Sequence, residues 1–510
     1  MSLDHQSSSP LYSAVNDMEP FPIPSQPPSS LSPTTFPGPN PETIKALQDV
    51  LNDNHKSHHI FFNDRGFHNH ITHQALAIWA LGGDQHVINA AYKRNQKIQR
   101  PAYDSPEPIT TENFNEHLGD ENFFNAYLKF FYDLVIVQQR DVPGLLEEYI
   151  FSPKANFATK NSTGKHPEML SRFLDAILHP MIHLGYGAEF GLPGMIVEGL
   201  AQTVVHGATS SPIIPASIFT SNPVPSVNSL ASRLHSVTFG KPSSGSDGTH
   251  AFTVLARVLK DPAMKIDVVA DDEIGFYANM MKNHAEGVFK HAMAWDLDTS
   301  DPKQVERKIA ELQWANMLIY ALPGFQRGQG DKFHADFFNM HLVTSSLFLP
   351  SIVPLLTPAS QEVFLRGYLA ISLTWWVARG RPNLDVESFF SADIAQPDLK
   401  ASSPAKLSLL SPPHSSATNP NPWLPIIQQA ILSPDDHVPK FQRAAAHYAR
   451  LYGSRVAGLP DFAGTELPGA DKIDGTLFIR AAGLTAQRLG RDFGGENMLS
   501  YWDRDSFFEQ

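Results

Sequence analysis

The chain has 510 residues, of which 42% are hydrophobic, so it is long enough to bury a large core. Its formal net charge of −13 leaves no basic surface of the kind that nucleic-acid binding needs, which excludes that class of partner. The absence of cysteine excludes disulfides, thiolate zinc sites, iron–sulfur clusters and a thiol nucleophile.

The N-terminal part of the chain predicts no folded element. Residues 1–40 are rich in Pro and Ser and have little to bury, which is typical of a disordered tail. They lack the charged and apolar regions of a signal peptide. The most apolar stretch, 345–356, is interrupted by Pro350 and Pro354 and falls short of the roughly 20 apolar residues that span a membrane. We therefore expect a soluble intracellular protein, cytoplasmic or vesicle-associated, without membrane insertion.

Between residues 41 and 490 the apolar residues recur mostly at helical spacing, which predicts an all-α fold in a single large multi-helix domain. The first helix is expected to begin at Pro41, with Asn40 as its N-cap. Pro180 predicts a kink or a restart within the helical stretch 166–190. The other predicted helices span residues 121–139, 193–206, 248–260, 270–294, 302–320, 332–349, 359–379, 424–432, 435–452 and 474–489.

Two further stretches rich in Ser and Pro, 209–248 and 391–420, fall between predicted helices. Because neither has the spacing of a helix or a strand, we expect loop insertions on the surface of one domain. Residues 491–510 are expected to form a C-terminal tail. The sequence carries no pattern that specifies an oligomeric state.

Histidines gather in short segments beside these apolar helices, around residues 68–73, 179–183, 341 and 437–440. Imidazole is the commonest metal ligand in proteins, and it titrates close to neutral pH. Imidazoles on separate helices can converge on one metal ion or one substrate. The pattern therefore indicates a buried reactive centre and favours a non-haem metal centre.

The first two segments have different spacings. His68, His70 and His73 precede an apolar helix, where capping or surface roles are the alternative to metal binding. His179 and His183 are four residues apart, the spacing at which one helical face presents two imidazoles to one metal ion. Core histidines bonded to backbone carbonyls are the alternative for this pair.

Two neighbouring motifs contain candidate substrate contacts. Tyr186 is suited to donate a hydrogen bond, and Glu189 to orient a ligand or to act as an acid or base. In the segment 374–382, Trp376 and Arg379 are suited to stack on and pair with a planar, oxygen-rich aromatic substrate. A packed helix end with solvated arginines is the alternative for the second motif.

His341 lies in an apolar helix and needs a partner, because burying an unpaired polar group costs about 1–3 kcal/mol. A metal ion would serve, and so would Thr344 or Ser345. His437 and Lys440 follow a helix start, and an ordinary surface helix is the simple interpretation. The sharper hypothesis is a buried Lys440, held neutral by desolvation and carbamylated by carbon dioxide into a carboxylate ligand.

The most distinctive segments of the chain are, in order, GFHNHITHQALAIWALGG, HPMIHLGYGAEF, DFFNMHLVTSSLF, WWVARGRP and NPWLPIIQQAI…DDHVPK. From about residue 40 to about residue 490 they resemble the questin oxidase-like family of fungal and bacterial proteins. This family includes the Baeyer–Villiger-type oxidase of aflatoxin biosynthesis. The resemblance implies dioxygen-dependent ester insertion or ring cleavage in an anthraquinone-like polyketide, with NADPH as reductant.

The resemblance also implies a set of site residues. The implied metal ligands are His73, His179, His183, His341, His437 and, as a modified side chain, Lys440. Of these, His183 and His341 are the implied catalytic residues. The chain departs from the family at Gln74, where a second histidine often follows the one at 73, and its Ser/Pro insertions look longer than is typical.

Neither the family nor this chain has the glycine motifs of flavin or dinucleotide binding, which favours a metal as the oxygen-activating group. Imidazoles with one carboxylate-like ligand suit Fe(II). The first hypothesis is therefore an iron-dependent oxygenase of a planar aromatic polyketide in fungal secondary metabolism. A metal-free, NADPH-dependent oxidase with histidine acid/base groups is the second. The third is a helical polyketide-binding protein without enzymatic activity.

Overall fold

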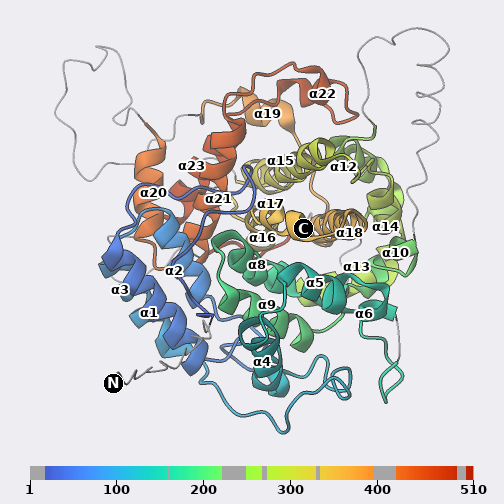
Figure 1. Cartoon of the computed structure of the whole chain (residues 1–510). Coiled ribbons are helices and arrows are strands. Elements are labelled where there is room, and N and C mark those ends of the chain that lie inside the picture. The colour runs from blue at the N-terminus through green and yellow to red at the C-terminus, as the bar shows by residue number, and fades with distance from the viewer. Residues whose placement is uncertain are drawn as a thin grey trace, which may run out of the picture.

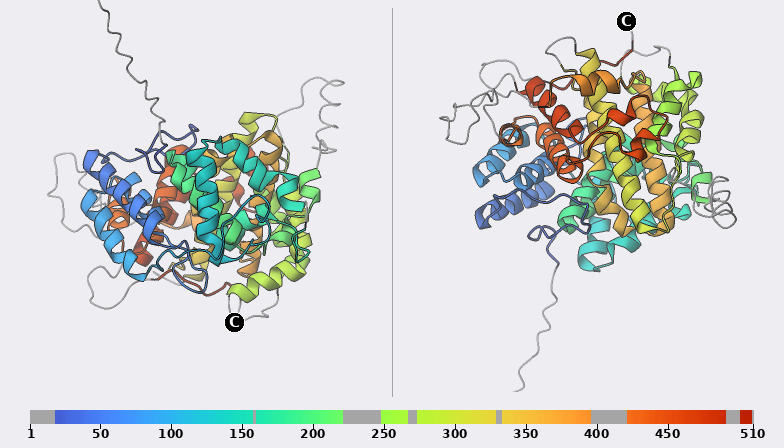
Figure 2. Two further views of the ribbon diagram at one scale, coloured as in Figure 1. Left: turned by 60° about the horizontal axis from the view of Figure 1, so that its bottom comes forward. Right: turned by 90° about the horizontal axis from the view of Figure 1, so that it is seen from above.

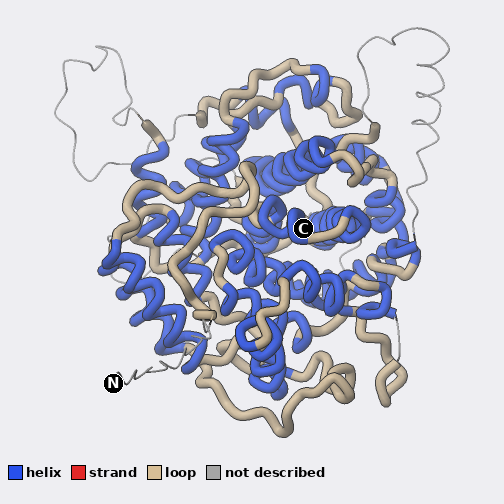
Figure 3. Tube along the Cα trace, in the orientation of Figure 1, coloured by secondary structure: helices blue, strands red, loops and turns tan. Residues whose placement is uncertain are grey.

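The computed structural model describes residues 18–157, 160–220, 248–266, 273–328, 333–395, 421–490 and 501–508. Within these ranges the chain is helical, with three isolated β-bridges and no β-strand (Figure 3). The helices form one domain. The predicted all-α fold class is confirmed.

The N-terminal half begins as predicted. Helix α1 (Pro41–Ser57) starts where the Asn40 side chain accepts hydrogen bonds from the backbone of Glu42 and Thr43. The long helix expected at 121–139 is instead a 3₁₀ turn, helix α4 and a π-helical turn that ends at Val137. The other helices of this half are α2 (Ile71–Ala80), α3 (Gln85–Asn95), α4 (Phe124–Tyr132), α5 (Val142–Leu146), α6 (Pro153–Phe157), α7 (Met169–Phe173), α8 (Asp175–Phe190), α9 (Pro193–Val205) and α10 (Ser217–Thr220).

In the C-terminal half, the helix predicted at 270–294 is divided into two at His284. Helix α15 runs beyond its predicted end at 320. The helices are α12 (Ala251–Lys260), α13 (Glu273–Asn283), α14 (Ala285–Met293), α15 (Pro302–Arg327), α16 (Phe337–Ser346), α17 (Leu349–Ile352), α18 (Pro358–Ala378), α19 (Val386–Ser391), α20 (Trp423–Ile431), α21 (His437–Tyr452), α22 (Pro460–Ala463) and α23 (Leu477–Leu489).

Helices from distant parts of the sequence meet in the middle of the domain. Figure 1 shows α8 and α16 near the centre, with α2 and α21 beside them. Both views in Figure 2 keep the N-terminal helices, drawn in blue, next to the C-terminal helices in orange and red. Helix α8 packs on α9 and α16, and α21 packs on α2 and α16. The four histidine-bearing segments are therefore brought to one place.

One stretch, Phe337–Leu355, is long and apolar enough to cross a membrane. In this structure 89% of that stretch is buried among other helices, so it serves as a core element. Its two prolines fall at helix starts, at Pro350 in α17 and at Pro354 in the following 3₁₀ turn. The predicted compartment stays a prediction.

Both expected tails differ from the structure in their extent. Residues 18–40 pack against the domain, because Phe21 gives this Pro-rich segment an apolar anchor, which is 1% exposed. At the other end, Trp502 is buried, and the Asp503 carboxylate lies 2.7 Å from Arg488. These anchors place 18–40 and 501–508 within the folded domain. Residues 1–17, 491–500 and 509–510 lie outside the described residues.

The predicted loop insertions fall largely outside the described residues, at 221–247 and 396–420. The described part of the first one, 209–220, contains a 3₁₀ turn and the short helix α10. Ser210 is buried there, with its hydroxyl 2.7 Å from that of Tyr277. The beginning of the first insertion is therefore packed onto the domain.

Candidate metal centre

The helices that carry the histidines are capped next to the centre. The Asn69 side chain accepts a hydrogen bond from the backbone of Ile71 at the start of α2 (3.0 Å). Asp435 Oδ1 accepts from the backbone N–H of His437 at the start of α21 (2.8 Å). Asp336 caps α16 in the same way. Because short polar side chains satisfy the free N–H groups, each helix can begin inside the protein.

Helix α8 enters the centre through a strained turn. Ala176, Ile177 and Leu178 have φ values of 48°, 55° and 65°, in the left-handed region that non-glycine residues rarely adopt. The turn places the carbonyl of Ala176 2.5 Å from Nδ1 of His179. Regular helix resumes at His179 and Pro180, so the predicted restart at this proline is present. The strain accompanies the placement of one imidazole.

The rings of His70, His179, His341 and His437 form a closed circuit, which we call the four-histidine circuit. Neighbouring ring centroids are 5.0 Å apart from His70 to His179, and 4.9 Å from there to His341. They are 5.1 Å apart from His341 to His437, and 4.8 Å from His437 back to His70. Members of the circuit come from α8, α16, α21 and the residue preceding α2. All of them are largely or fully buried.

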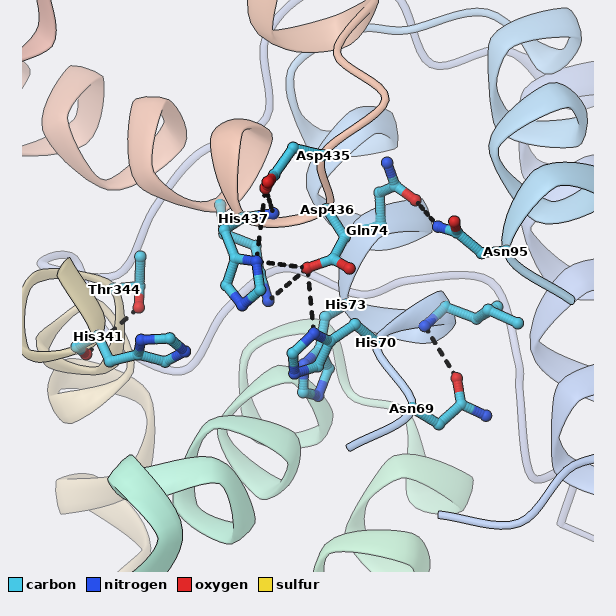
Figure 4. A network of polar contacts seen from close by, with 12 residues as sticks. Asn69, His70, His73, Gln74, Asn95, His341, Thr344, Asp435, Asp436 and His437 are labelled. Atoms are coloured by element: carbon cyan, nitrogen blue, oxygen red, sulfur yellow. Dashed lines mark hydrogen bonds and ion pairs between the residues drawn. The ribbon is translucent and has the colours of Figure 1, made fainter. Parts of the chain in front are cut away.

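One nitrogen of each imidazole is held by the protein. Nδ1 of His70 and Nδ1 of His437 lie 3.0 and 2.8 Å from the same oxygen, Oδ1 of Asp436, which lies between the two rings (Figure 4). Nδ1 of His341 lies 2.7 Å from the carbonyl oxygen of Phe337. Figure 4 shows His341 approaching the other two rings from α16.

The second nitrogen has no hydrogen-bond partner among the described residues. The Nε2 atoms of His70, His179, His341 and His437 are buried without a hydrogen bond. Buried polar atoms are nearly always paired, so several such atoms in one place need an explanation. Metal-binding histidines show this arrangement, with one nitrogen on a carboxylate or carbonyl and the other free for the ion. The donors present therefore fit a metal ion.

Electrostatics favour neutral rings in most of the cluster. Burial, together with the nearby Lys440, lowers the pKa of His70 to about 4, against the effect of Asp436. Burial, followed by neighbouring imidazoles, holds the pKa values of His179 and His341 well below the usual range. His437 differs: burial lowers its pKa, but the Asp436 and Asp435 carboxylates together raise it above the ordinary value. A neutral imidazole is the form that binds a metal.

His73 and His183 lie beside the four-histidine circuit. The centroid of His73 is 5.6 Å from that of His70. Nε2 of His73 lies 3.0 Å from Nδ1 of His183, whose own Nε2 lies 2.7 Å from Oε2 of Glu198. Nδ1 of His73 is buried without a partner, so this residue keeps a nitrogen for a ligand. Both nitrogens of His183 are engaged, which argues against its predicted role as a ligand.

Lys440 is buried, as the sharper hypothesis required. Its Nζ atom lies 3.5 Å from Oδ1 of Asp436, and the residue is 5% exposed. Burial lowers the pKa of the Lys440 amine, and the carboxylates of Asp436 and Asp435 oppose this effect. The amine therefore lies next to the four-histidine circuit, on the same helix as His437.

Tyr186 and Glu189 lie one and two turns further along α8 from His183. The Tyr186 ring is stacked on that of His73, with centroids 5.0 Å apart. Glu189 forms an ion pair with Arg443 of α21, yet its Oε2 atom has no hydrogen-bond partner. Burial raises the pKa of Glu189 to about 7, although Arg443 opposes this shift. The pair leaves buried polar atoms next to the cluster.

Trp376 and Arg379 are engaged in holding the fold together. The Trp376 indole N–H donates to the carbonyl of Pro382 at 3.2 Å. Arg379 donates to Oδ2 of Asp336 at 2.6 Å and to two carbonyls of the C-terminal segment. The guanidinium also lies 4.6 Å from the ring centroid of Phe338. The predicted substrate contact of these two residues therefore gains no support from their positions.

Sequence reasoning passed over several residues that the fold brings here. For His70, a capping or surface role was the alternative to metal binding, and Asp436 was not predicted as a site residue. His68 stacks on His179 at 3.9 Å, and its Nε2 lies 2.7 Å from that of His206. Candidate ligand atoms lie within 4.8 Å of one another in the group His68–His70–His179 and in the group His70–Asp436–His437.

Some of these residues carried a signal in the sequence. Glu198 is the single acidic residue within α9, and a lone carboxylate in such an apolar run indicates a buried partner. Asp436 directly precedes His437. His206 follows an apolar run without any motif, so only the fold reveals it.

A groove of about 820 Å³ lies elsewhere, lined by residues between 104 and 149. No histidine lines it. Its polar side chains carry both signs of charge. The groove therefore adds nothing to the chemistry of the histidine cluster.

The fold and the site define this protein as an all-helical protein built around a buried, histidine-rich centre. The model of the questin oxidase-like family matches residues 67–445, which include every histidine of that centre. The chain belongs to the questin oxidase-like family. This confirms the resemblance carried by the sequence motifs.

Characterised relatives are fungal oxidases. The Baeyer–Villiger oxidase ptaJ of Pestalotiopsis fici is 27% identical over 370 residues, or 70% of this chain and 74% of that protein. The questin oxidase of Aspergillus terreus is 25% identical, covering 68% of this chain and 72% of that protein. The oxidoreductase AflY of Aspergillus parasiticus is 26% identical, covering 78% and 71%. The chain is accordingly an oxidoreductase.

Proposed function

We propose that this protein carries out a Baeyer–Villiger-type oxidation or ring cleavage of an anthraquinone-like aromatic polyketide in fungal secondary metabolism. The reaction takes place at a histidine-rich, non-haem metal centre, for which Fe(II) is the proposed ion. The names of the relatives support the oxidation. The free Nε2 atoms of the four-histidine circuit support the metal centre, and they are the observation on which the proposal depends most.

His70, His179, His341 and His437 would hold the ion through Nε2, with His73 available through Nδ1. When bound, a redox-active iron ion supplies the one-electron chemistry that reactions of dioxygen require. This set replaces His183 by His70 relative to the set expected from the sequence, because both nitrogens of His183 are engaged. Asp436 and the carbonyls of Ala176 and Phe337 would fix the ring orientations.

Lys440 is the proposed source of a carboxylate-like ligand. Carbon dioxide adds to a neutral amine to give a carbamate, and the amine loses one proton. The lowered pKa of Lys440 favours the neutral amine that this reaction needs. The modified side chain would bring a negative charge to a site whose other ligands are neutral.

The remaining residues would bind and orient the substrate. Tyr186 offers an aromatic face beside His73, and Glu189 with Arg443 offers unpaired polar atoms in a dry environment. His341 is the proposed catalytic residue among the ligands, because α16 carries it into the four-histidine circuit between His179 and His437. Burial of the whole cluster excludes water, which protects a reactive intermediate from hydrolysis.

The overall reaction needs a reductant. One oxygen atom of dioxygen enters between the carbonyl carbon and the adjacent ring carbon, and the other leaves as water. NADPH with one proton balances this reaction, and the family resemblance implies it as the electron source. In the second candidate function NADPH is used without a metal, and His183 acts as an acid/base group held by Glu198 at 2.7 Å.

Elemental analysis of protein made in iron-supplemented medium tests the proposal, together with oxygen uptake in the presence of NADPH and questin as the probe. We expect a stoichiometric transition metal and a loss of oxygen uptake after chelation, restored by Fe(II). Protein that contains no stoichiometric metal and is unaffected by chelators would instead support the metal-free oxidase. Binding of questin without any oxygen uptake would support the non-enzymatic alternative.

A further inference from the structure

A chain of hydrogen bonds runs from the histidine centre to helix α1. Nε2 of His73 lies 3.0 Å from Nδ1 of His183, and Nε2 of His183 lies 2.7 Å from Oε2 of Glu198. The other carboxylate oxygen, Oε1, lies 2.6 Å from Nδ1 of His55. The side chains of His183 and Glu198 are 1% and 4% exposed, and that of His55 is 13% exposed. The His55 end of this series of hydrogen bonds therefore reaches water.

The direction of each hydrogen bond follows from the chemistry of the groups. An ionised carboxylate only accepts, so Nε2 of His183 must carry the proton that it donates to Glu198. In a neutral imidazole the other nitrogen then has a lone pair, so Nδ1 of His183 accepts a proton from Nε2 of His73. Nδ1 of His73 is then unprotonated and keeps a free lone pair, and this atom is buried without a partner.

We propose that Glu198 is a positioning residue that sets the tautomers of His183 and His73, so that His73 offers an unprotonated Nδ1 as a metal ligand. The inference rests on the proposed metal centre, and it adds Glu198 to the residues that support that centre. Glu198 does not touch the four-histidine circuit. Its effect is transmitted through hydrogen-bond polarity over two imidazoles.

The opposite polarity requires a doubly protonated His183. Its Nδ1 would then donate to His73, whose Nδ1 would carry a proton and could not bind a metal. This state differs from the proposed one in a measurable way, because it places a proton on Nδ1 of His73. Burial raises the pKa of Glu198, but hydrogen bonds from His183 and His55 lower it to about 2, which keeps the carboxylate ionised.

Histidine-selective ¹⁵N NMR of the metal-free protein reads the tautomers directly, because protonated and bare ring nitrogens differ in chemical shift. The variant His73→Gln identifies the signals of His73 by their loss. In the wild type we expect a protonated Nε2 and a bare Nδ1 at His73. A proton on Nδ1 of His73 in the wild type would overturn the inference.

Metal affinity provides the second measurement, with Co(II) as a spectroscopic probe in competition with a chelator. Glu198→Leu removes the acceptor and should weaken Co(II) binding by about 10–100-fold. Glu198→Gln should restore much of the affinity, because its amide oxygen still accepts from His183. His55→Phe is the matched control: it keeps the ring packing on Phe21 and the bond from His183 to Glu198, so we expect affinity near that of the wild type.

Equal Co(II) affinity in Glu198→Leu and the wild type would also overturn the inference. Thermal unfolding of each variant shows whether it is folded. If Glu198→Leu does not fold, the tautomer of His73 in the wild type decides the question alone. A wild type that binds no Co(II) would count against the proposed function, whereas the tautomer, read without metal, would still decide this inference.

Discussion

Nδ1 of His70 lies 3.0 Å from Oδ1 of Asp436, although 366 positions separate the two residues in the chain. The contact joins the start of α2 to the start of α21. The same oxygen also contacts Nδ1 of His437 and Nζ of Lys440, at 2.8 and 3.5 Å. Asp436 therefore orients two rings of the proposed metal centre and lies next to its proposed carbamylation site.

The variant Asp436→Asn should weaken metal binding by about 10–100-fold, the usual effect of losing a carboxylate behind ligating histidines. The amide oxygen can take the place of Oδ1, but it carries no negative charge, so it holds the N–H groups of His70 and His437 less strongly. The measurement is a titration of the metal-free protein with Co(II) against a chelator. Asp385→Asn is the control, because Asp385 caps α19, away from the histidines. Unchanged affinity in Asp436→Asn would mean that the two rings do not depend on this carboxylate.

Removal of His341 should abolish the proposed oxidation. We expect His341→Ala to lower the rate of questin-dependent oxygen uptake by more than about 100-fold, since losing a ligand costs more than losing the group behind it. His447→Ala is the matched control: His447 is also a buried helical histidine, and its Nε2 lies 2.8 Å from the carbonyl of Leu31. That variant should lose stability and keep its activity. Similar rates for both variants would remove His341 from the site.

Acid should destabilise the metal-free protein. Burial lowers the pKa of His206 to about 3 and that of His70 to about 4, so the folded protein keeps these rings neutral. The unfolded chain binds protons at both positions as the pH falls below about 6.5. Their contribution is present above that pH and is lost on acidification, by about 1.4 kcal/mol per pH unit for each ring.

Urea unfolding between pH 7.5 and 5 measures this slope. His206→Gln should lower the slope by about one histidine's share, because the buried amide does not titrate in this range. A free energy of unfolding that does not change over these pH values would show that the rings are charged in the folded protein.

The strained turn at the start of α8 predicts a stabilising substitution. Ala176 has φ 48°, which costs an L-residue about 1–2 kcal/mol and costs glycine almost nothing. Glycine loses more backbone entropy on folding, so Ala176→Gly should raise the free energy of unfolding by a net ~0.5–1 kcal/mol. The control Ala201→Gly lies within helix α9 and should lower it by at least about 1 kcal/mol. Urea unfolding of both variants is the measurement, and a less stable Ala176→Gly would argue against strain at this position.

Local patterns of the sequence determined much of the helical framework. Asn40 and Pro41 set the start of α1, and Pro180 marks where regular helix resumes in α8. These features act over a few residues, through the backbone N–H groups they satisfy or the φ angle they restrict, so they can be read without a fold. The apolar spacing also placed the histidine segments in or beside helices. The breaks within 121–139 and 270–294 were missed, because their apolar residues continue through them.

The tertiary structure decided which side chains meet. It brought His70 into the four-histidine circuit, placed Glu198 behind His183, and paired Arg379 with Asp336. None of these contacts follows from the spacing of residues, because each joins different helices whose packing is set by the whole core. The anchored segments 18–40 and 501–508 have the same cause. Single aromatic side chains, Phe21 and Trp502, bury enough surface to hold chain whose composition alone predicted a tail.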